Sequence, residues 1–260
     1  MRKPVLSLLV ALIALPAASQ PDDAKAKRRA EIVAEATKVL AEQDSFAAIQ
    51  FIENRDDPGD IITSYDALSQ ASYWQRKDLQ PSIAMARAGI QFGLTTAPSI
   101  DDEKLAAGLL GVAKALAYNV ASFTWPGWDE PGIEITRSDV LVGLDAARTN
   151  LRLAQELDKP DIALSRAHWM LAAAQLALDE YEPTQAGFLR AVDFARKAGE
   201  DIEAANSVAC ARLVAHIADP EDTRKREALD AAKVALEAAG DDGFFSGQIE
   251  TAERVFAPGR

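Results

Sequence analysis

Cysteine, histidine and aromatic residues are scarce in this chain. Its 260 residues include one cysteine, two histidines and 7% aromatic residues. A single cysteine excludes an intramolecular disulfide, and His168 and His216 stand too far apart to suggest the three or four ligands of a zinc site. Serine-hydrolase elbows, phosphate-binding glycine loops and dinucleotide fingerprints are also missing. We therefore predict no catalytic residue, no metal site and no cofactor.

Positive charge is also in deficit. The chain has 28 basic and 40 acidic residues, a net charge of −12. A phosphate backbone is bound by clustered Lys and Arg, so nucleic acid and anionic membrane surfaces are poor partners for an acidic protein. A basic segment of another protein suits this charge better.

The first residues have the pattern of an export signal. Arg2 and Lys3 precede an apolar run from Val5 to Leu15, after which Pro16 and small residues lead to Gln20. This order matches a secretory signal peptide. The alternative is a membrane anchor, but the run is shorter than the roughly 20 apolar residues that a spanning helix needs. We expect residues 1–19 to be removed near Gln20. The mature protein is then periplasmic or secreted, with no membrane span, and its net charge is −14 because Arg2 and Lys3 are lost.

Helical periodicity dominates the rest of the chain. Hydrophobic residues make up 48% of the sequence, much of it alanine, leucine and valine, which favours closely packed helices over sheets. The pattern predicts one all-α domain over residues 20–260, with helices near 22–43, 45–53, 62–77, 80–95, 102–123, 137–157, 161–179, 183–198, 202–217, 220–239 and 244–256.

Several helix boundaries have local signals. Thr136 and Asp139 resemble a capping box, and Asp219 before Pro220 predicts the cap of the helix over 220–239. Gly108 and Gly111 would allow a neighbouring helix to approach closely. The acidic groups at 56–60 and 101–103 could suggest calcium or catalysis, but their place before helices favours capping. Cys210 stands among apolar residues, so we expect it to be buried.

A helix end recurs along the sequence. Residues 153–158, 194–201 and 235–242 are similar and lie 41 residues apart. Within residues 168–193, Leu171-Ala172, Tyr181, Phe188 and Ala191 stand in the order of the tetratricopeptide repeat, which this unit resembles, although Gln175, Thr184 and Arg196 depart from the family pattern. The resemblance implies a right-handed α-solenoid of antiparallel helix pairs and, by analogy, protein–protein interaction.

One segment interrupts the helical pattern. Residues 123–132 contain Trp125, Trp128, Asp129 and Glu130 together with two Pro-Gly turns, at 126–127 and 131–132. A rigid loop with aromatics beside carboxylates can stack on a sugar, a cationic group or a partner's side chain. Alternatively, both indoles fill a gap between repeats, because large aromatic side chains usually pack.

Tyr73 and Trp74 form a second aromatic group on a predicted helix. They either line a concave binding surface or belong to the core of an N-terminal helix pair. With the four residues of the interrupting segment, they are the candidate binding residues of the sequence.

Three functions follow as hypotheses. The first is an exported, non-enzymatic scaffold for protein–protein interaction in the cell envelope. The second is a small-molecule or glycan binder that uses Trp125 and Trp128. The third is a glycan-acting enzyme with two carboxylates in a cleft, a class whose residues have no fixed sequence spacing.

Overall fold

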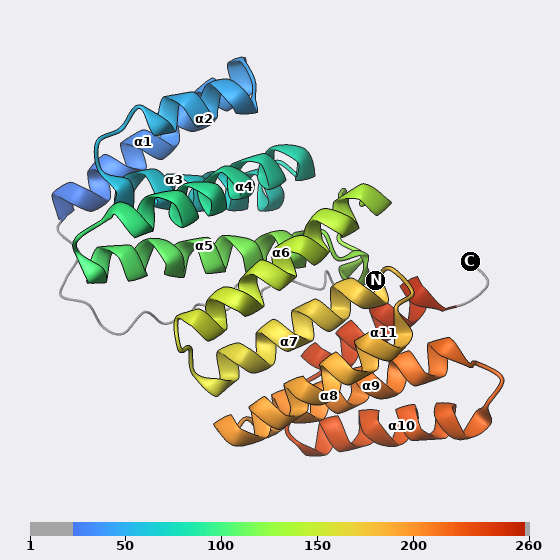
Figure 1. Ribbon diagram of the computed structural model, residues 1–260. Helices are drawn as coiled ribbons and strands as arrows, with labels where there is room; N and C mark the ends of the chain where they lie inside the picture. The colour runs from blue at the N-terminus through green and yellow to red at the C-terminus, as the bar shows by residue number, and fades with distance from the viewer. Residues whose placement is uncertain (1–22, 258–260) are drawn as a thin grey trace.

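Residues 23–257 are described by a computed structural model, and they form helices joined by turns, with no strand among them (Figure 1). The predicted leader and its cleavage site lie outside these residues. The helices are α1 (Asp23–Glu42), α2 (Ser45–Glu53), α3 (Pro58–Trp74), α4 (Leu79–Thr96), η1 (Ala97–Ser99), α5 (Glu103–Phe123), η2 (Pro126–Trp128), α6 (Arg137–Glu156), α7 (Asp161–Leu176), α8 (Tyr181–Ala198), α9 (Asp201–Ala218), α10 (Thr223–Ala238) and α11 (Phe244–Phe256).

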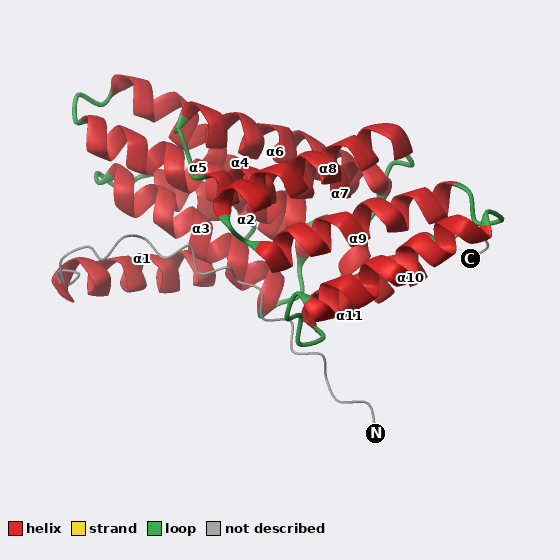
Figure 2. Ribbon diagram, turned by 90° about the horizontal axis from the view of Figure 1, so that it is seen from below, coloured by secondary structure: helices red, strands yellow, loops and turns green. Residues whose placement is uncertain are grey.

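Most helices pack mainly against their neighbours in the chain, whereas α11 packs mainly against η2 and α9. Consecutive helices run back and forth in Figure 1, and odd-numbered helices also contact one another, in the pairs α1–α3, α3–α5, α5–α7 and α9–α11. Seen from below, α1 and α11 lie on the same side of the central helices (Figure 2). The all-helical prediction is confirmed, and the sequential packing is compatible with a helical repeat.

The 41-residue recurrence corresponds to one turn geometry. Asp158, Gly199 and Gly240 follow α6, α8 and α10 with φ of 46°, 75° and 103°. In each turn the next residue donates its backbone N–H to a carbonyl five residues earlier, as in a Schellman motif. These bonds are Lys159 to Ala154 (2.9 Å), Glu200 to Ala195 (3.0 Å) and Asp241 to Leu236 (3.3 Å). The even-numbered helices α6, α8 and α10 therefore end in the same way.

The unit that resembles a tetratricopeptide repeat forms the pair α7–α8. Phe188 and Ala191 on α8 are buried, as is Ala172 on α7. A Cβ added at Gly187 would lie 2.9 Å from the Cβ of Ala172, so the helices cross closely here. Ser165 donates a hydrogen bond to the Ala191 carbonyl at 2.8 Å. The predicted small and large positions thus belong to the contact between these two helices.

The capping predictions have mixed outcomes. Thr136 and Asp139 form the capping box of α6, and Asp57 and Asp102 cap α3 and α5. The prediction that Asp219 begins a helix is wrong, because α10 begins at Thr223 with Asp222 as its N-cap. The Asp222 carboxylate accepts the backbone N–H of Arg224 at 3.1 Å, which satisfies a donor of the first turn.

Two glycines on α5 have a different role from the predicted one. A Cβ added at Gly108 or Gly111 would meet no atom within 4 Å, so the prediction of a close helix approach there is wrong. The close approach occurs at Gly93 on α4, where a Cβ would lie 2.9 Å from Ala113 of α5. Gly108 and Gly111 instead lie on an open side of α5.

By length and composition, α5 is the one described helix that could cross a membrane, which the sequence reading did not anticipate. In the fold it packs against α3, α4, α6 and α7. Only 39% of its most apolar window is buried, however. Its apolar character therefore serves helix packing on some sides and leaves an uncovered surface on another.

Candidate functional site

The interrupting segment forms a tight turn between α5 and α6. Pro126–Trp128 is a single 3-10 turn, and Asp129 follows in the left-handed region at φ 47°. The Trp128 indole N–H donates to the Ser122 carbonyl at 2.8 Å, which ties the turn back to α5. A Cβ at Gly127 would collide with the Trp125 ring, so only glycine fits at this position.

The two indoles of this turn belong to an aromatic cluster, defined here as Trp125, Trp128, Trp169, Phe188 and Phe256. Trp125 meets Trp128 edge to face, with 4.6 Å between centroids, and Trp169 of α7 lies 5.5 Å and 5.9 Å from the two rings. Trp125 is 3% exposed, whereas Trp128 is half-buried. Most of this aromatic surface therefore packs on itself.

Helix α11 covers one side of the cluster. The Phe256 ring lies 6.0 Å from Trp125. Arg254 Nη2 lies 2.7 Å from Asp129 Oδ2, which pairs the C-terminal helix with the turn. The Asp129 carboxylate is thus already engaged within the chain.

Tyr73 and Trp74 lie on the other side of the same turn. Tyr73 is buried and stacks on Phe123 at 3.9 Å, and Trp74 meets both rings edge to face. Lys77 Nζ lies 2.6 Å from Glu130 Oε1 and over the Tyr73 and Trp74 rings. The fold therefore joins the two predicted groups, which lie about 50 residues apart in the sequence, through Phe123 and this ion pair.

Sequence reasoning overlooked Lys114 on α5. This lysine is 8% exposed, and it has no hydrogen bond or ion pair with any residue that the structure describes. Burial, together with the positive charges of Lys159 and Arg166, lowers the pKa of its ammonium to about 8. Arg166 Nε donates to both Glu203 oxygens, at 3.1 and 3.2 Å, so its own charge is paired. Lys114 is left as a buried cation without an acceptor.

A further buried polar side chain stands on the helix opposite. Asn150 of α6 is fully buried, and its amide nitrogen and oxygen have no partner among the described residues. Gly143 of α6 approaches Ala121 of α5. Because the two helices are antiparallel, moving two turns along each brings Asn150 level with Lys114. No sequence signal marked either residue, because their polarity is unusual only once they are buried.

The open strip of α5 consists of Ala107, Gly108, Gly111 and Ala115. These residues recur at three- and four-residue intervals, so they share one side of the helix. Ala107 and Gly108 are exposed, and Gly111 and Ala115 are partly exposed. Lys114 stands beside the strip.

A zinc site needs three or four ligands from the protein. The described residues contain no group of three or more His, Cys, Asp or Glu side chains that could hold a metal ion. No protein-family model matches the chain, and no curated protein or solved structure matches it either.

Proposed function

We propose that this chain is an exported scaffold, similar to tetratricopeptide-repeat proteins, that mediates protein–protein interaction in the cell envelope. The proposal combines the leader-like N-terminal sequence with the sequentially packed helices. Stacked helix pairs present extended surfaces that suit peptide segments of other proteins. Right-handed solenoid geometry and export are part of this proposal.

The observation that carries the proposal is the open strip of α5. A helix with this much apolar character is usually covered on all sides, yet a Cβ at Gly108 or Gly111 would point into open space. An extended segment of a partner could lie against these small residues and bury apolar side chains there. One of its backbone carbonyls would supply the acceptor that Lys114 lacks.

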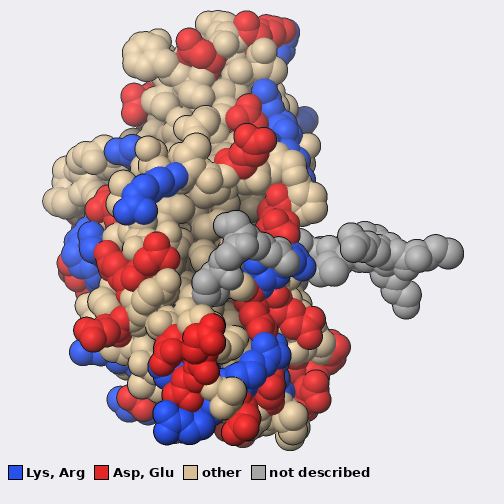
Figure 3. Space-filling model, turned by 90° about the vertical axis from the view of Figure 1, so that its right-hand side faces the viewer, with Lys and Arg blue, Asp and Glu red and all other residues tan. Residues whose placement is uncertain are grey.

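The charge of the chain indicates the kind of partner. The net charge of −12 favours encounter with a basic segment. On the face drawn in Figure 3 the two signs of charge are interspersed, and acidic groups are more frequent in its lower half. A segment with apolar residues for α5 and flanking Lys or Arg for the surrounding carboxylates fits both features.

The packing around the Trp125 turn favours this function over glycan or small-molecule binding. Stacking on a sugar needs an accessible aromatic face. Trp125 is 3% exposed, and Trp128 stacks on Trp169. These contacts give the aromatic residues a role in holding α5, α7 and α11 together.

A site-specific photocrosslinker tests the proposal. We would place it at Ala107 on the open strip and, as a matched control, at Leu141 on α6, which is 50% exposed. Crosslinking in an envelope extract should give a defined protein product from position 107 only, and Gly111→Trp should abolish it by filling the strip. Identical products from both positions, or no product from position 107, would contradict the proposal.

A further inference from the structure

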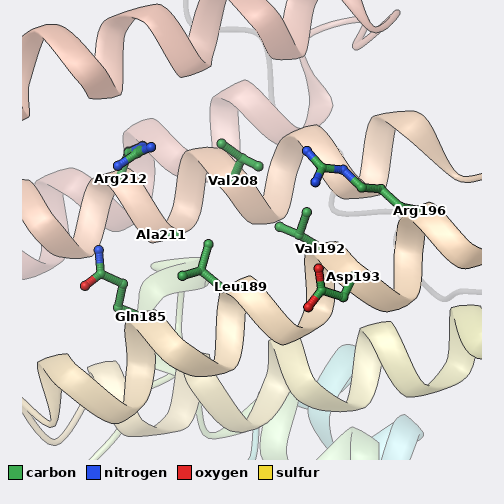
Figure 4. Close-up of a pocket in the computed structure, with 8 residues that line it drawn as sticks. All are labelled: Gln185, Leu189, Val192, Asp193, Arg196, Val208, Ala211 and Arg212. Atoms are coloured by element: carbon green, nitrogen blue, oxygen red, sulfur yellow. The ribbon is translucent and has the colours of Figure 1, made fainter.

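A groove lies between α8 and α9, away from the open strip of α5 (Figure 4). Its volume is about 500 Å³, and its apolar lining comes from Leu189 and Val192 of α8 and from Val208 and Ala211 of α9. Leu189 is 50% exposed, which makes it one of the few large apolar side chains that the described surface presents to solvent. Helix α8 packs against α7 and α9, while α10 packs on α9. On the side of α8 that lines the groove, Leu189 is therefore left uncovered, whereas Val192 is buried.

Two arginines stand at the ends of this groove. In Figure 4, Arg196 and Arg212 lie toward opposite ends of the apolar lining. Both are exposed, and neither side chain forms an ion pair or hydrogen bond within the described part of the chain. Asp193 is the one carboxylate in the lining, so the groove has a net positive charge in an acidic protein.

The spacing of the arginines defines the shape of a partner. Helices α8 and α9 are joined by a two-residue turn, with Arg196 two residues before the end of α8 and Arg212 eleven residues after the start of α9. At 1.5 Å per residue, the two positions are about 13 Å apart along the groove. A helix meets this spacing with carboxylates seven to ten residues apart and apolar residues between them.

Helix α10 of this same chain has such a surface. Val234 is 65% exposed, the most exposed large apolar residue on the described helices after Phe46. Three acidic residues lie on the same side of α10 as Val234. Glu227 and Asp230 precede Val234 by seven and four residues, and Glu237 follows it by three. We call these four residues the acidic ridge. Among the residues that the structure describes, Asp230 alone of these four has a cationic partner, Arg226 at 3.0 Å.

We propose that a second copy of this chain docks its acidic ridge into the α8–α9 groove. Val234 would lie against Leu189 and Val208, and the ridge carboxylates would meet Arg196 and Arg212. Groove and ridge are on neighbouring parts of the array, so two copies related by a twofold axis would each supply both surfaces. The inference goes beyond the scaffold role and does not depend on it, because the α5 strip is not involved.

The contact is expected to be weak and sensitive to salt. It relies on one valine of the ridge, a small apolar lining in the groove and exposed charge pairs, which salt screens. Analytical ultracentrifugation of the purified chain over a wide concentration range should show reversible dimerisation at low salt that declines at high salt. Val234→Asp and Arg196→Glu/Arg212→Glu should each leave the chain monomeric.

Two controls make the outcome specific. Leu141→Asp changes an exposed leucine outside both surfaces, 50% exposed against 65% for Val234, so its dimerisation should match that of the unaltered chain. Adding Glu227→Arg and Glu237→Arg to the arginine reversals should restore dimerisation, and circular dichroism melts would show that each variant folds. The proposal would be overturned if the unaltered chain stayed monomeric at every concentration and salt level, or if the combined charge reversals did not restore dimerisation. Binding of a foreign acidic helix to the groove would not change that conclusion.

Discussion

Arg254 and Asp129 are 125 residues apart in the sequence and 2.7 Å apart in the fold. This contact fixes the last helix against the turn between α5 and α6. It brings the Phe256 side chain to the aromatic cluster, so that the C-terminal segment becomes part of the packing around Trp125. The packing of α11 against this turn depends on both a charge pair and apolar burial, and mutations can separate the two contributions.

The charge pair should contribute little by itself. Arg254 and Asp129 are 47% and 56% exposed, so Arg254→Ala should lower the free energy of unfolding by at most about 1 kcal/mol. Urea denaturation measures this, and Arg152→Ala provides the control, since its pair with Glu156 is similarly exposed. Phe256→Ala should cost more, because it removes apolar contact with Trp125. A larger loss for Arg254→Ala than for Phe256→Ala would show that the ion pair dominates.

The glycines of α4 and α5 should respond in opposite ways to alanine. Gly108→Ala adds a methyl group in open space within a helix and should stabilise the chain by about 0.5–1 kcal/mol. Gly93→Ala places a Cβ 2.9 Å from the Cβ of Ala113, and overpacking of this kind costs about 1–3 kcal/mol. Thermal melts followed by circular dichroism compare the two variants. Destabilisation by Gly108→Ala would mean that the strip is covered in solution.

Lys114 should make stability depend on pH. Its pKa is about 8 in the folded chain and near 10.5 when unfolded. Between these values the unfolded state binds more protons, so the contribution of this group to stability rises with pH. Lys114→Met should therefore be more stable than the unaltered chain at pH 7, by up to about 3 kcal/mol.

The pH series should compare the two proteins directly. Their difference in unfolding free energy should narrow between about pH 8 and pH 10. Taking the difference between the two proteins cancels the pH dependence that other groups give to stability. One such group is Cys210, whose raised pKa makes stability fall as pH rises. A difference that stays constant across this range would show that Lys114 is not buried as a cation.

Cys210 should be inert in the folded protein. Its thiol is buried, and burial raises its pKa to about 12, so almost no thiolate exists at neutral pH. A thiol reagent should label the chain only after denaturation, as absorbance of the released chromophore would show. Ala107→Cys supplies a matched exposed thiol on α5 and should react at once. Rapid labelling of Cys210 under native conditions would require local opening around α9.

The predicted helix ends succeed where the signal is local. A capping box at Thr136, a left-handed glycine at Gly199 and the recurring turn every 41 residues each depend on backbone groups within about one helical turn. The predicted start at Asp219 failed although Pro220 follows it, because Asp222 offers a competing carboxylate three residues later. The sequence offers both carboxylates as caps, and the structure has Asp222 accept the Arg224 N–H.

By itself, the sequence determined the succession of helices and the repeat of their ends, because periodic apolar residues and caps act over short distances. It also indicated the burial of Cys210. Only the tertiary structure decided that Tyr73, Trp74 and the Trp125 turn share one region, that Asp129 pairs with Arg254, and that Gly108 and Gly111 stay uncovered. These outcomes depend on which helix faces meet, and the contacts that set them join residues tens of positions apart.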